Sequence, residues 1–146
     1  MAPSPLLFPD NTNSAILAAV SAANAGLRGG AGLDGQFHPA AGPGLARELV
    51  QSFPAGGITA GAYETGSHNI QPTNHIIHAV GPDYRAVRST AQISNAEGNL
   101  AVTYRDILKA TIRIGARTVP IPTISTGIFA FPRVRAARIA LATVRD

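Results

Sequence analysis

The stretch SAANAGLRGGAGLDGQFH, residues 21–38, tells more about this chain than any other part of its sequence. It is too rich in glycine to form a regular helix or strand, and two polar residues, Asn24 and Asp34, lie near its ends. Glycine lets a backbone approach a ligand closely, and free amide groups before a helix bind anions. The stretch therefore predicts a ligand-binding loop between a strand and a helix.

A second glycine-containing junction lies near the end of the chain, in PTISTGIFAFP, residues 122–132. It also leads from an apolar run into a helical pattern. Ligands of open α/β sheets bind where the parallel strands end, so we expect the two loops to face each other at one edge of a sheet. Their amide groups can then hold a diphosphate from both sides.

Residues 30–35, GAGLDG, fit the dinucleotide fingerprint G-x-G-x-x-G only in a formal sense. In that fingerprint the glycines come at the tip of the strand, whereas here they follow several residues after the apolar run. The sequence also lacks the Gly-Lys-Ser or Gly-Lys-Thr of the P-loop. We therefore do not expect a Rossmann dehydrogenase or a P-loop protein.

The rest of the chain alternates between strand and helix patterns. Short apolar runs predict buried strands at residues 15–23, 75–81 and 117–124, and a weaker strand at 57–65. Helices are predicted at residues 33–38, 44–53 and 99–112, and from Pro132 onward. In the last helix we expect the inner face to consist of Val134, Ala137, Leu141 and Val144. This alternation predicts a three-layer α/β/α fold with a mostly parallel sheet.

Length and composition set further limits. We expect residues 1–146 to form a single domain, since 146 residues suffice for one core. Hydrophobic residues make up 45% of the chain and charged residues 14%, which is typical of a globular protein. The absence of cysteine excludes disulfides, a thiolate nucleophile and cysteine-ligated zinc. The net charge of +4 favours anionic partners only mildly, and surface solubility explains it equally well.

No targeting or membrane segment is predicted. The start MAPSPLLFPD has no basic region and no apolar run of signal-peptide length. No segment has the roughly 18 unbroken apolar residues that a membrane span needs. We expect a cytoplasmic protein with no membrane partner.

Four blocks, kept in order and spacing, resemble the macro domain family of ADP-ribose-binding α/β proteins. They are AAVSAANAGLRGGAGLDGQFHPAAG at 18–42, HIIHAVGP at 75–82, LAVTYRDILKA at 100–110 and PTISTGIFAFPRVRAARIAL at 122–141. Within the family, GGAGLDG is similar to the loop of the branch that removes mono-ADP-ribose from acidic side chains and deacetylates O-acetyl-ADP-ribose. The resemblance implies a macro-domain fold and ADP-ribose, free or on a protein, as partner. It implies no metal and no cofactor.

The resemblance also assigns a ligand contact to particular residues. Asp10 matches the acid that accepts the adenine amino group, and Asn11 follows where a backbone N–H meets the ring. Phe129 matches the aromatic residue against the distal ribose. The two diphosphate loops correspond to Gly29, Gly30, Ala31, Gly32 and Leu33, and to Ser125, Thr126, Gly127 and Ile128.

The catalytic roles implied by the resemblance fall on Asn24 and Asp34. Asn24 matches the asparagine that hydrogen-bonds a distal ribose hydroxyl, and Asp34 the acid that activates or orients the attacking water. Hydrolysis needs a positioned water and a group that polarises it, which a carboxylate or a substrate phosphate can supply. Each residue also has a simpler interpretation. Asp34 can favour a helix N-terminus by its charge, and Asn24 can hold a turn.

The histidines predict no metal site. His75 and His78 are three residues apart on a strand, so they point to opposite faces. We expect His78 to be a buried structural residue. His38 follows Asp34 by one helical turn, where it can orient the carboxylate or simply pack. Of the two aromatic residues in the second loop, we expect Phe129 to face the ligand and Phe131 to face the core.

The chain departs from the family pattern in several places. Ser21 replaces a usual asparagine, Ala31 a usual glycine and Pro9 the glycine before Asp10. The family also has a fuller first strand and a further strand after the last helix, so we expect a fold shortened at both ends. We predict that residues 6–8 supply a short strand beside residues 117–122, or that a partner chain covers this edge as a dimer.

Three functions remain open from the sequence. The first is an enzyme that hydrolyses ADP-ribosylated protein or O-acetyl-ADP-ribose, which Asn24 and Asp34 together favour. The second is a recognition module that binds ADP-ribose or poly-ADP-ribose without turnover. The third, a nucleic-acid binder driven by charge, is not expected because the chain has no basic run with interleaved aromatic residues.

Overall fold

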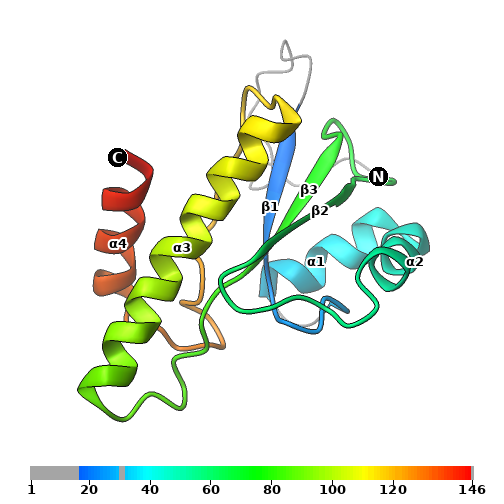
Figure 1. The fold of residues 1–146 in the computed structure, drawn as a ribbon. Coiled ribbons are helices and arrows are strands. Elements are labelled where there is room, and N and C mark those ends of the chain that lie inside the picture. Colours follow the sequence, from blue (N-terminus) through cyan, green and yellow to red (C-terminus); the bar gives the residue numbers. More distant parts are fainter. Residues whose placement is uncertain (1–16, 30–31, 146) are drawn as a thin grey trace.

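The structure is a computed structural model that describes residues 17–29 and 32–145. Its elements follow the expected alternation of strands and helices (Figure 1). They are β1 (Ala18–Ala23), α1 (Gly32–Ala41), α2 (Pro43–Ser52), β2 (Ala62–Gly66), β3 (His75–Val80), α3 (Thr90–Ile114) and α4 (Arg133–Arg145). The predicted α/β fold is confirmed.

The three named strands form one mixed sheet in the order β1-β3-β2. β1 and β3 are parallel, with Ala18 opposite His75 and Ala23 opposite Val80. β2 runs antiparallel to β3, so among the described residues the sheet has one parallel and one antiparallel pairing. The parallel pairing brings the carboxyl ends of β1 and β3 to the same edge.

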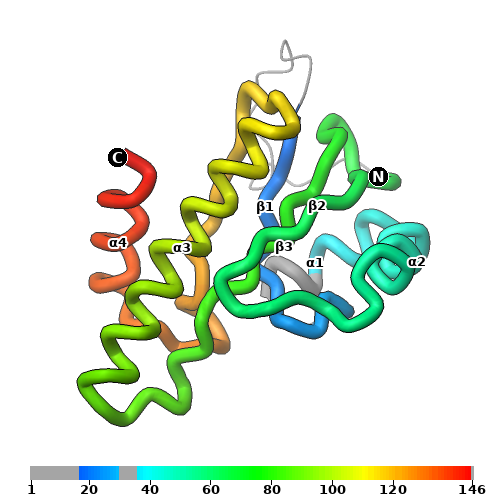
Figure 2. The backbone as a smooth tube through the Cα atoms, viewed as in Figure 1, coloured from blue at the N-terminus to red at the C-terminus, as the bar shows by residue number. Residues whose placement is uncertain are grey.

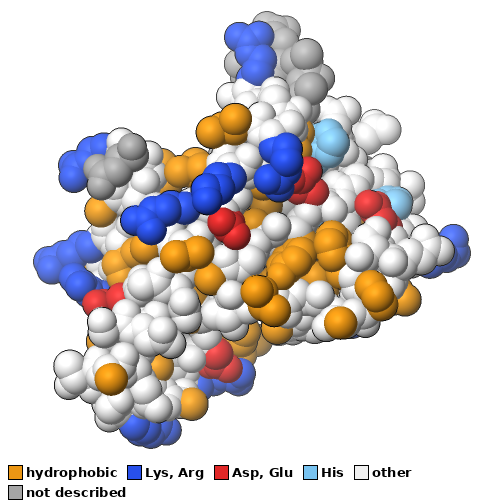
Figure 3. Space-filling model, viewed as in Figure 1, with side chains coloured by type: hydrophobic (Ala, Val, Ile, Leu, Met, Phe, Trp, Pro, Cys, Tyr) orange, Lys and Arg blue, Asp and Glu red, His pale blue; other side chains and the backbone are white. Residues whose placement is uncertain are grey.

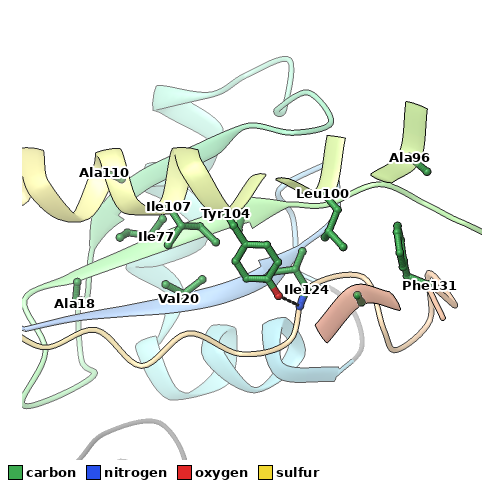
Figure 4. Close-up of a cluster of buried hydrophobic side chains, with 12 residues drawn as sticks. Ala18, Val20, Ile77, Ala96, Leu100, Tyr104, Ile107, Ala110, Ile124 and Phe131 are labelled. Carbon is green, nitrogen blue, oxygen red and sulfur yellow. Dashed lines mark hydrogen bonds between the residues drawn. The ribbon is translucent and has the colours of Figure 1, made fainter. Parts of the chain in front are cut away.

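Helices cover both faces of this sheet, which gives the three layers (Figure 1). On one face α1 and α2 pack through Phe37, Leu45 and Leu49 against a cluster that includes Ala19 and Ile76. On the other face α3 packs on Ala18, Val20 and Ile77, and α4 packs against α3 (Figure 4). Both faces of β1 and β3 are covered, so nearly all of their side chains are buried, including the polar Ser21 and His78.

Two helix boundaries differ from the sequence prediction. α3 begins at Thr90, nine residues before the predicted start, because Ser89 and Gln92 form a capping box. The hydroxyl of Ser89 accepts the N–H of Gln92 at 3.1 Å, and the Gln92 side chain accepts the N–H of Ser89 at 3.1 Å. The break between α1 and α2 falls at Gly42, whose φ is 82°, and Pro43 opens the second helix.

The predicted inner face of α4 is wrong. Val134, Leu141 and Val144 are 69%, 72% and 46% exposed, and Ala137 is exposed as well. The buried positions are Ala136 and Thr143, with Ile139 and Ala140 partly buried beside them. The two buried positions carry small side chains, which lets this side of α4 approach α3 closely. The start of α4 was predicted correctly, since the Pro132 carbonyl accepts the N–H of Ala136 at 2.9 Å.

The predicted strand at residues 117–124 is reduced to a single bridge, in which Leu17 pairs with Thr118 (Figure 2). The Thr118 carbonyl accepts the N–H of Ala18, so the backbone groups of Thr118 face β1. Alternate residues of an extended chain share an edge, which places Pro120 and Pro122 on this edge. Proline has no N–H to donate, and the ladder therefore stops. The predicted stand-in strand at residues 6–8 lies outside the described residues.

Acidic side chains lie among the basic ones on the face that α3 presents (Figure 3). Two exposed ion pairs tie α3 to its neighbours: Arg113 with Glu64 of β2, and Arg135 of α4 with Glu97. None of the described helices is long and apolar enough to cross a membrane.

Candidate ligand-binding site

The two predicted loops meet at the carboxyl edge of β1 and β3. The first loop, residues 24–29, follows β1 directly. The second, residues 125–131, lies against the end of β3, because a Cβ at Gly81 would be 2.2 Å from Ser125 Oγ and 2.4 Å from Ile124 Cγ2. Only glycine permits this approach, so the residue after β3 fixes the position of the second loop.

The first loop presents Asn24 on the surface at the end of β1. The Asn24 carbonyl accepts the N–H of Leu27 at 3.1 Å, which closes a turn, and Leu27 is buried with a φ of 54°. The Asn24 amide lies 3.5 Å from the Gly29 carbonyl, and Gly29 has a φ of 87°. The backbone then continues into α1, whose first turn contains Gly32, Leu33 and Asp34.

The loop after α2 braces the first loop from outside. The Arg28 guanidinium donates to the carbonyls of Phe53 and Pro54, both at 3.1 Å. The Gly57 N–H donates to the Ala25 carbonyl at 2.7 Å. These bonds hold the peptide groups on both sides of the turn, so the loop is fixed by other backbone segments.

The second loop is held from inside the core. The hydroxyl of Tyr104, a buried residue of α3, accepts the N–H of Ile124 at 3.0 Å (Figure 4). Burial raises the pKa of this hydroxyl. Ser125 and Ala130 have φ values of 67° and 59°, and the Ser125 carbonyl accepts the N–H of Phe131 at 2.9 Å. The loop is therefore a tight turn anchored at both ends.

Several polar groups of the second loop have no internal partner. The N–H groups of Thr126, Gly127 and Ile128 donate to no other described residue. The Ser125 hydroxyl is buried and likewise makes no hydrogen bond within the described part of the chain. Gly127 and Ile128 are exposed. Unpaired amides that precede a helix are the donors that bind an anion.

Phe131 faces the core as predicted, whereas the ligand contact of Phe129 stays a prediction. Phe131 is 2% exposed and packs against the Tyr84 ring, with centroids 4.8 Å apart. Phe129 is only partly buried, and its carbonyl accepts the N–H of Tyr84 at 2.9 Å. The Arg85 guanidinium lies over the Phe129 ring, 5.5 Å from its centroid.

His38 lies beside the first loop, and His78 lies within β3. A Cβ on Gly29 would be 3.2 Å from the His38 ring, so this ring supports the loop. His78 is buried, and its Nε2 lies 2.9 Å from Thr65 Oγ1. Burial, and secondarily the charge of His38, lowers the pKa of His78 to about 3. His78 is thus neutral and structural, and the described residues contain no cluster of three metal-ligating side chains.

The structure describes the position of some of the predicted site residues and not of others. The described chain brings Asn24 and Gly29 to the same edge as Ser125, Thr126, Gly127, Ile128 and Phe129. The backbone of Gly32, Leu33 and Asp34 begins α1. Asp10, Asn11, Gly30 and Ala31 lie outside the described residues. Their ligand contacts remain predictions.

Four supporting residues were missed from the sequence: Gly81, Tyr104, Arg28 and Arg85. Gly81 had a usable signal, because a Gly-Pro pair directly after a buried strand marks a close backbone approach. Tyr104 lies within the predicted helix at residues 99–112, where its pattern indicates a core position and nothing more. No sequence motif indicated the contacts of Arg28 and Arg85.

Comparison with known proteins gives a consistent result. The model of the Macro domain family matches residues 20–140. The macro domain-containing protein TTE0995 of Caldanaerobacter subterraneus is 40% identical over 131 residues, which are 88% of this chain and 71% of that protein. O-acetyl-ADP-ribose deacetylase 1 of Pantoea vagans is 37% identical over 138 residues, 93% of this chain and 77% of that protein.

Solved structures are similar in fold. The Oceanobacillus iheyensis macrodomain with ADP has a TM-score of 0.76 at 32% identity, over 87% of this chain and 66% of that one. The Trypanosoma brucei macrodomain in complex with ADP-ribose has a TM-score of 0.75 at 34% identity, over 88% of this chain and 50% of that one. The chain thus spans between half and two thirds of these two structures.

Proposed function

The chain belongs to the macro domain family, and we propose that it binds ADP-ribose and hydrolyses mono-ADP-ribose from acidic side chains or the acetyl ester of O-acetyl-ADP-ribose. The observation that supports binding is that the N–H groups of Thr126, Gly127 and Ile128, at the carboxyl edge of the sheet, donate to no other described residue. Gly29 lies in the loop that follows β1 at the carboxyl edge of the same sheet, and α1 begins at Gly32. A diphosphate between the two loops would receive hydrogen bonds from both.

With the diphosphate in that place, one sugar of the ligand extends toward Asn24 and Phe129. Asn24 is exposed at the end of β1, where its amide can bind a ribose hydroxyl. Asp34 belongs to the first turn of α1. These two residues are the proposed catalytic pair. The proposed ligand contacts are completed by four residues outside the described chain: Asp10, Asn11, Gly30 and Ala31.

The proposed reaction is a hydrolysis at the distal ribose. In a protein substrate, water replaces the side-chain carboxylate at the anomeric carbon. In O-acetyl-ADP-ribose, water attacks the acetyl ester on the same sugar, and acetate leaves. The Asp34 carboxylate or a substrate phosphate accepts the proton of the water. Much of the rate comes from holding ribose and water in line.

Two homologues named O-acetyl-ADP-ribose deacetylase support the enzymatic proposal. The competing interpretation is a recognition module with the same pocket. An ADP-ribosylated protein as partner and a cytoplasmic location belong to the same proposal.

The test combines binding and turnover. The protein is titrated with ADP-ribose by calorimetry, and incubated with glutamate-linked mono-ADP-ribosylated protein and with O-acetyl-ADP-ribose. We expect binding, and release of ADP-ribose or acetate that Asn24→Ala and Asp34→Ala reduce by at least about tenfold. Asp106→Ala, on α3, is the matched control. Binding without release identifies a recognition module, and no heat at millimolar ADP-ribose refutes the whole proposal.

A further inference from the structure

The segment after β3 and the second loop form one unit. The Tyr84 N–H donates to the Phe129 carbonyl at 2.9 Å, and the Tyr84 ring packs on Phe131. Gly81 is in close contact with Ser125 and Ile124. Residues 81–84 therefore help to determine where the backbone of Phe129 lies.

The side chain of Phe129 has a separate support. The Arg85 guanidinium lies 5.5 Å from the centroid of its ring. Asp83 orients this guanidinium, with Nε 2.9 Å from Oδ1 and Nη2 2.6 Å from Oδ2. Asp83 Oδ1 also accepts the backbone N–H of Arg85 at 3.0 Å. A carboxylate that binds the planar fork at two points fixes the plane of the guanidinium as well as its position.

Holding these two side chains in one geometry costs conformational entropy, and an exposed ion pair alone does not offset that cost. The side chains of Arg85 and Asp83 are 55% and 41% exposed, and pairs this exposed add little to the stability of a fold. The stacking of a cation on an aromatic face nevertheless restrains the ring. The ordered group is the aromatic ring beside the proposed sugar site.

We infer that Asp83 and Arg85 are positioning residues that hold the Phe129 ring for the distal ribose. The guanidinium covers one face of the ring and leaves the other for the sugar. The inference rests on the proposed function, because the sugar contact is part of that proposal. It assigns to the pair a role in recognising the second ribose and none in binding the diphosphate.

The experiment exploits a ligand that lacks the second ribose. Affinities for ADP and ADP-ribose are measured by calorimetry for the unmodified protein, Arg85→Ala, Arg85→Lys, Asp83→Asn and Arg88→Ala. Arg88 is the matched control: it lies on the same segment but bonds to the backbone carbonyls of Arg85 and Val87. Thermal unfolding of each variant checks that the fold is kept.

We expect Arg85→Ala to weaken ADP-ribose binding about two- to fivefold and to leave ADP binding unchanged. Asp83→Asn should have a smaller effect of the same kind, and Arg85→Lys should restore part of the loss because it keeps the charge without the fork. An equal loss for both ligands, or an equal effect of Arg88→Ala, overturns the inference and leaves the proposed function standing. Absence of ADP-ribose binding by the unmodified protein overturns both.

Discussion

The hydrogen bond between Tyr104 and Ile124 links the core to the ligand loop, and its removal should affect both stability and binding. Tyr104→Phe keeps the ring and deletes the oxygen that accepts the Ile124 N–H at 3.0 Å (Figure 4). Tyr104 is 3% exposed and Ile124 1%, so water does not replace the lost acceptor without rearrangement. A buried N–H without a partner costs about 1–3 kcal/mol.

For a chain of this length each kcal/mol corresponds to roughly 2–4 °C in Tm, so we expect a decrease of roughly 2–12 °C. The affinity for ADP-ribose should fall as well, because Ile124 directly precedes the loop with the unpaired amides. Urea unfolding followed by circular dichroism gives the stability, and calorimetry gives the affinity.

Tyr84→Phe provides the matched control for this experiment. The Tyr84 ring packs on Phe131 in the same region, but its hydroxyl bonds to no other described residue. This variant should therefore stay within about 0.5 kcal/mol of the unmodified protein. If Tyr104→Phe is equally stable, the reasoning that the core holds the loop through this bond is refuted.

Three further predictions follow from contacts of the described residues. Gly81→Ala should destabilise the chain by about 1–3 kcal/mol and weaken ADP-ribose binding, because the new Cβ would be 2.2 Å from Ser125 Oγ; unchanged unfolding and binding would contradict this. Since the pKa of His78 is lowered from 6.5 to about 3, the unfolded chain binds a proton that the folded chain excludes, and the free energy of unfolding should fall as the pH drops through this window. The loss is up to about 1.4 kcal/mol per pH unit, and urea unfolding of His78→Asn should show a shallower pH dependence; identical slopes would refute the assignment. Leu141→Ser should change Tm by less than about 2 °C because the side chain is 72% exposed, whereas a large decrease would show that it is buried.

The sequence predicted those parts of the fold that depend on short-range patterns. The runs around Val20 and Ile77 are mostly apolar, and they are the central buried strands. The glycine-rich junction after β1 and the Ser-Thr-Gly junction before α4 were recognised because they interrupt such patterns. Their meeting at one edge followed from the parallel pairing of β1 and β3.

Features that depend on geometry between distant residues were missed or wrong. On α4 the predicted inner face was Val134, Ala137, Leu141 and Val144, but packing against α3 buries Ala136 and Thr143 instead. At residues 117–124 the apolar pattern indicated a strand. Pro120 and Pro122 fall on the edge that faces β1, where they have no N–H to donate, and so no ladder of hydrogen bonds forms. Neither the buried face of α4 nor the loss of this strand can be predicted from the neighbouring sequence alone.

Backbone strain at the proposed site explains why its supports are so numerous. Among the described residues, five non-glycine residues have positive φ, and three of them lie in the two ligand loops: Leu27, Ser125 and Ala130. Such conformations cost free energy and persist only where surrounding contacts impose them. Leu27 is fixed by burial, and Ser125 by the anchors of the preceding Ile124 and by Gly81. Because the core and the neighbouring loops meet this cost before any ligand arrives, a bound diphosphate does not have to order the loop, and more of its interaction energy is available as affinity.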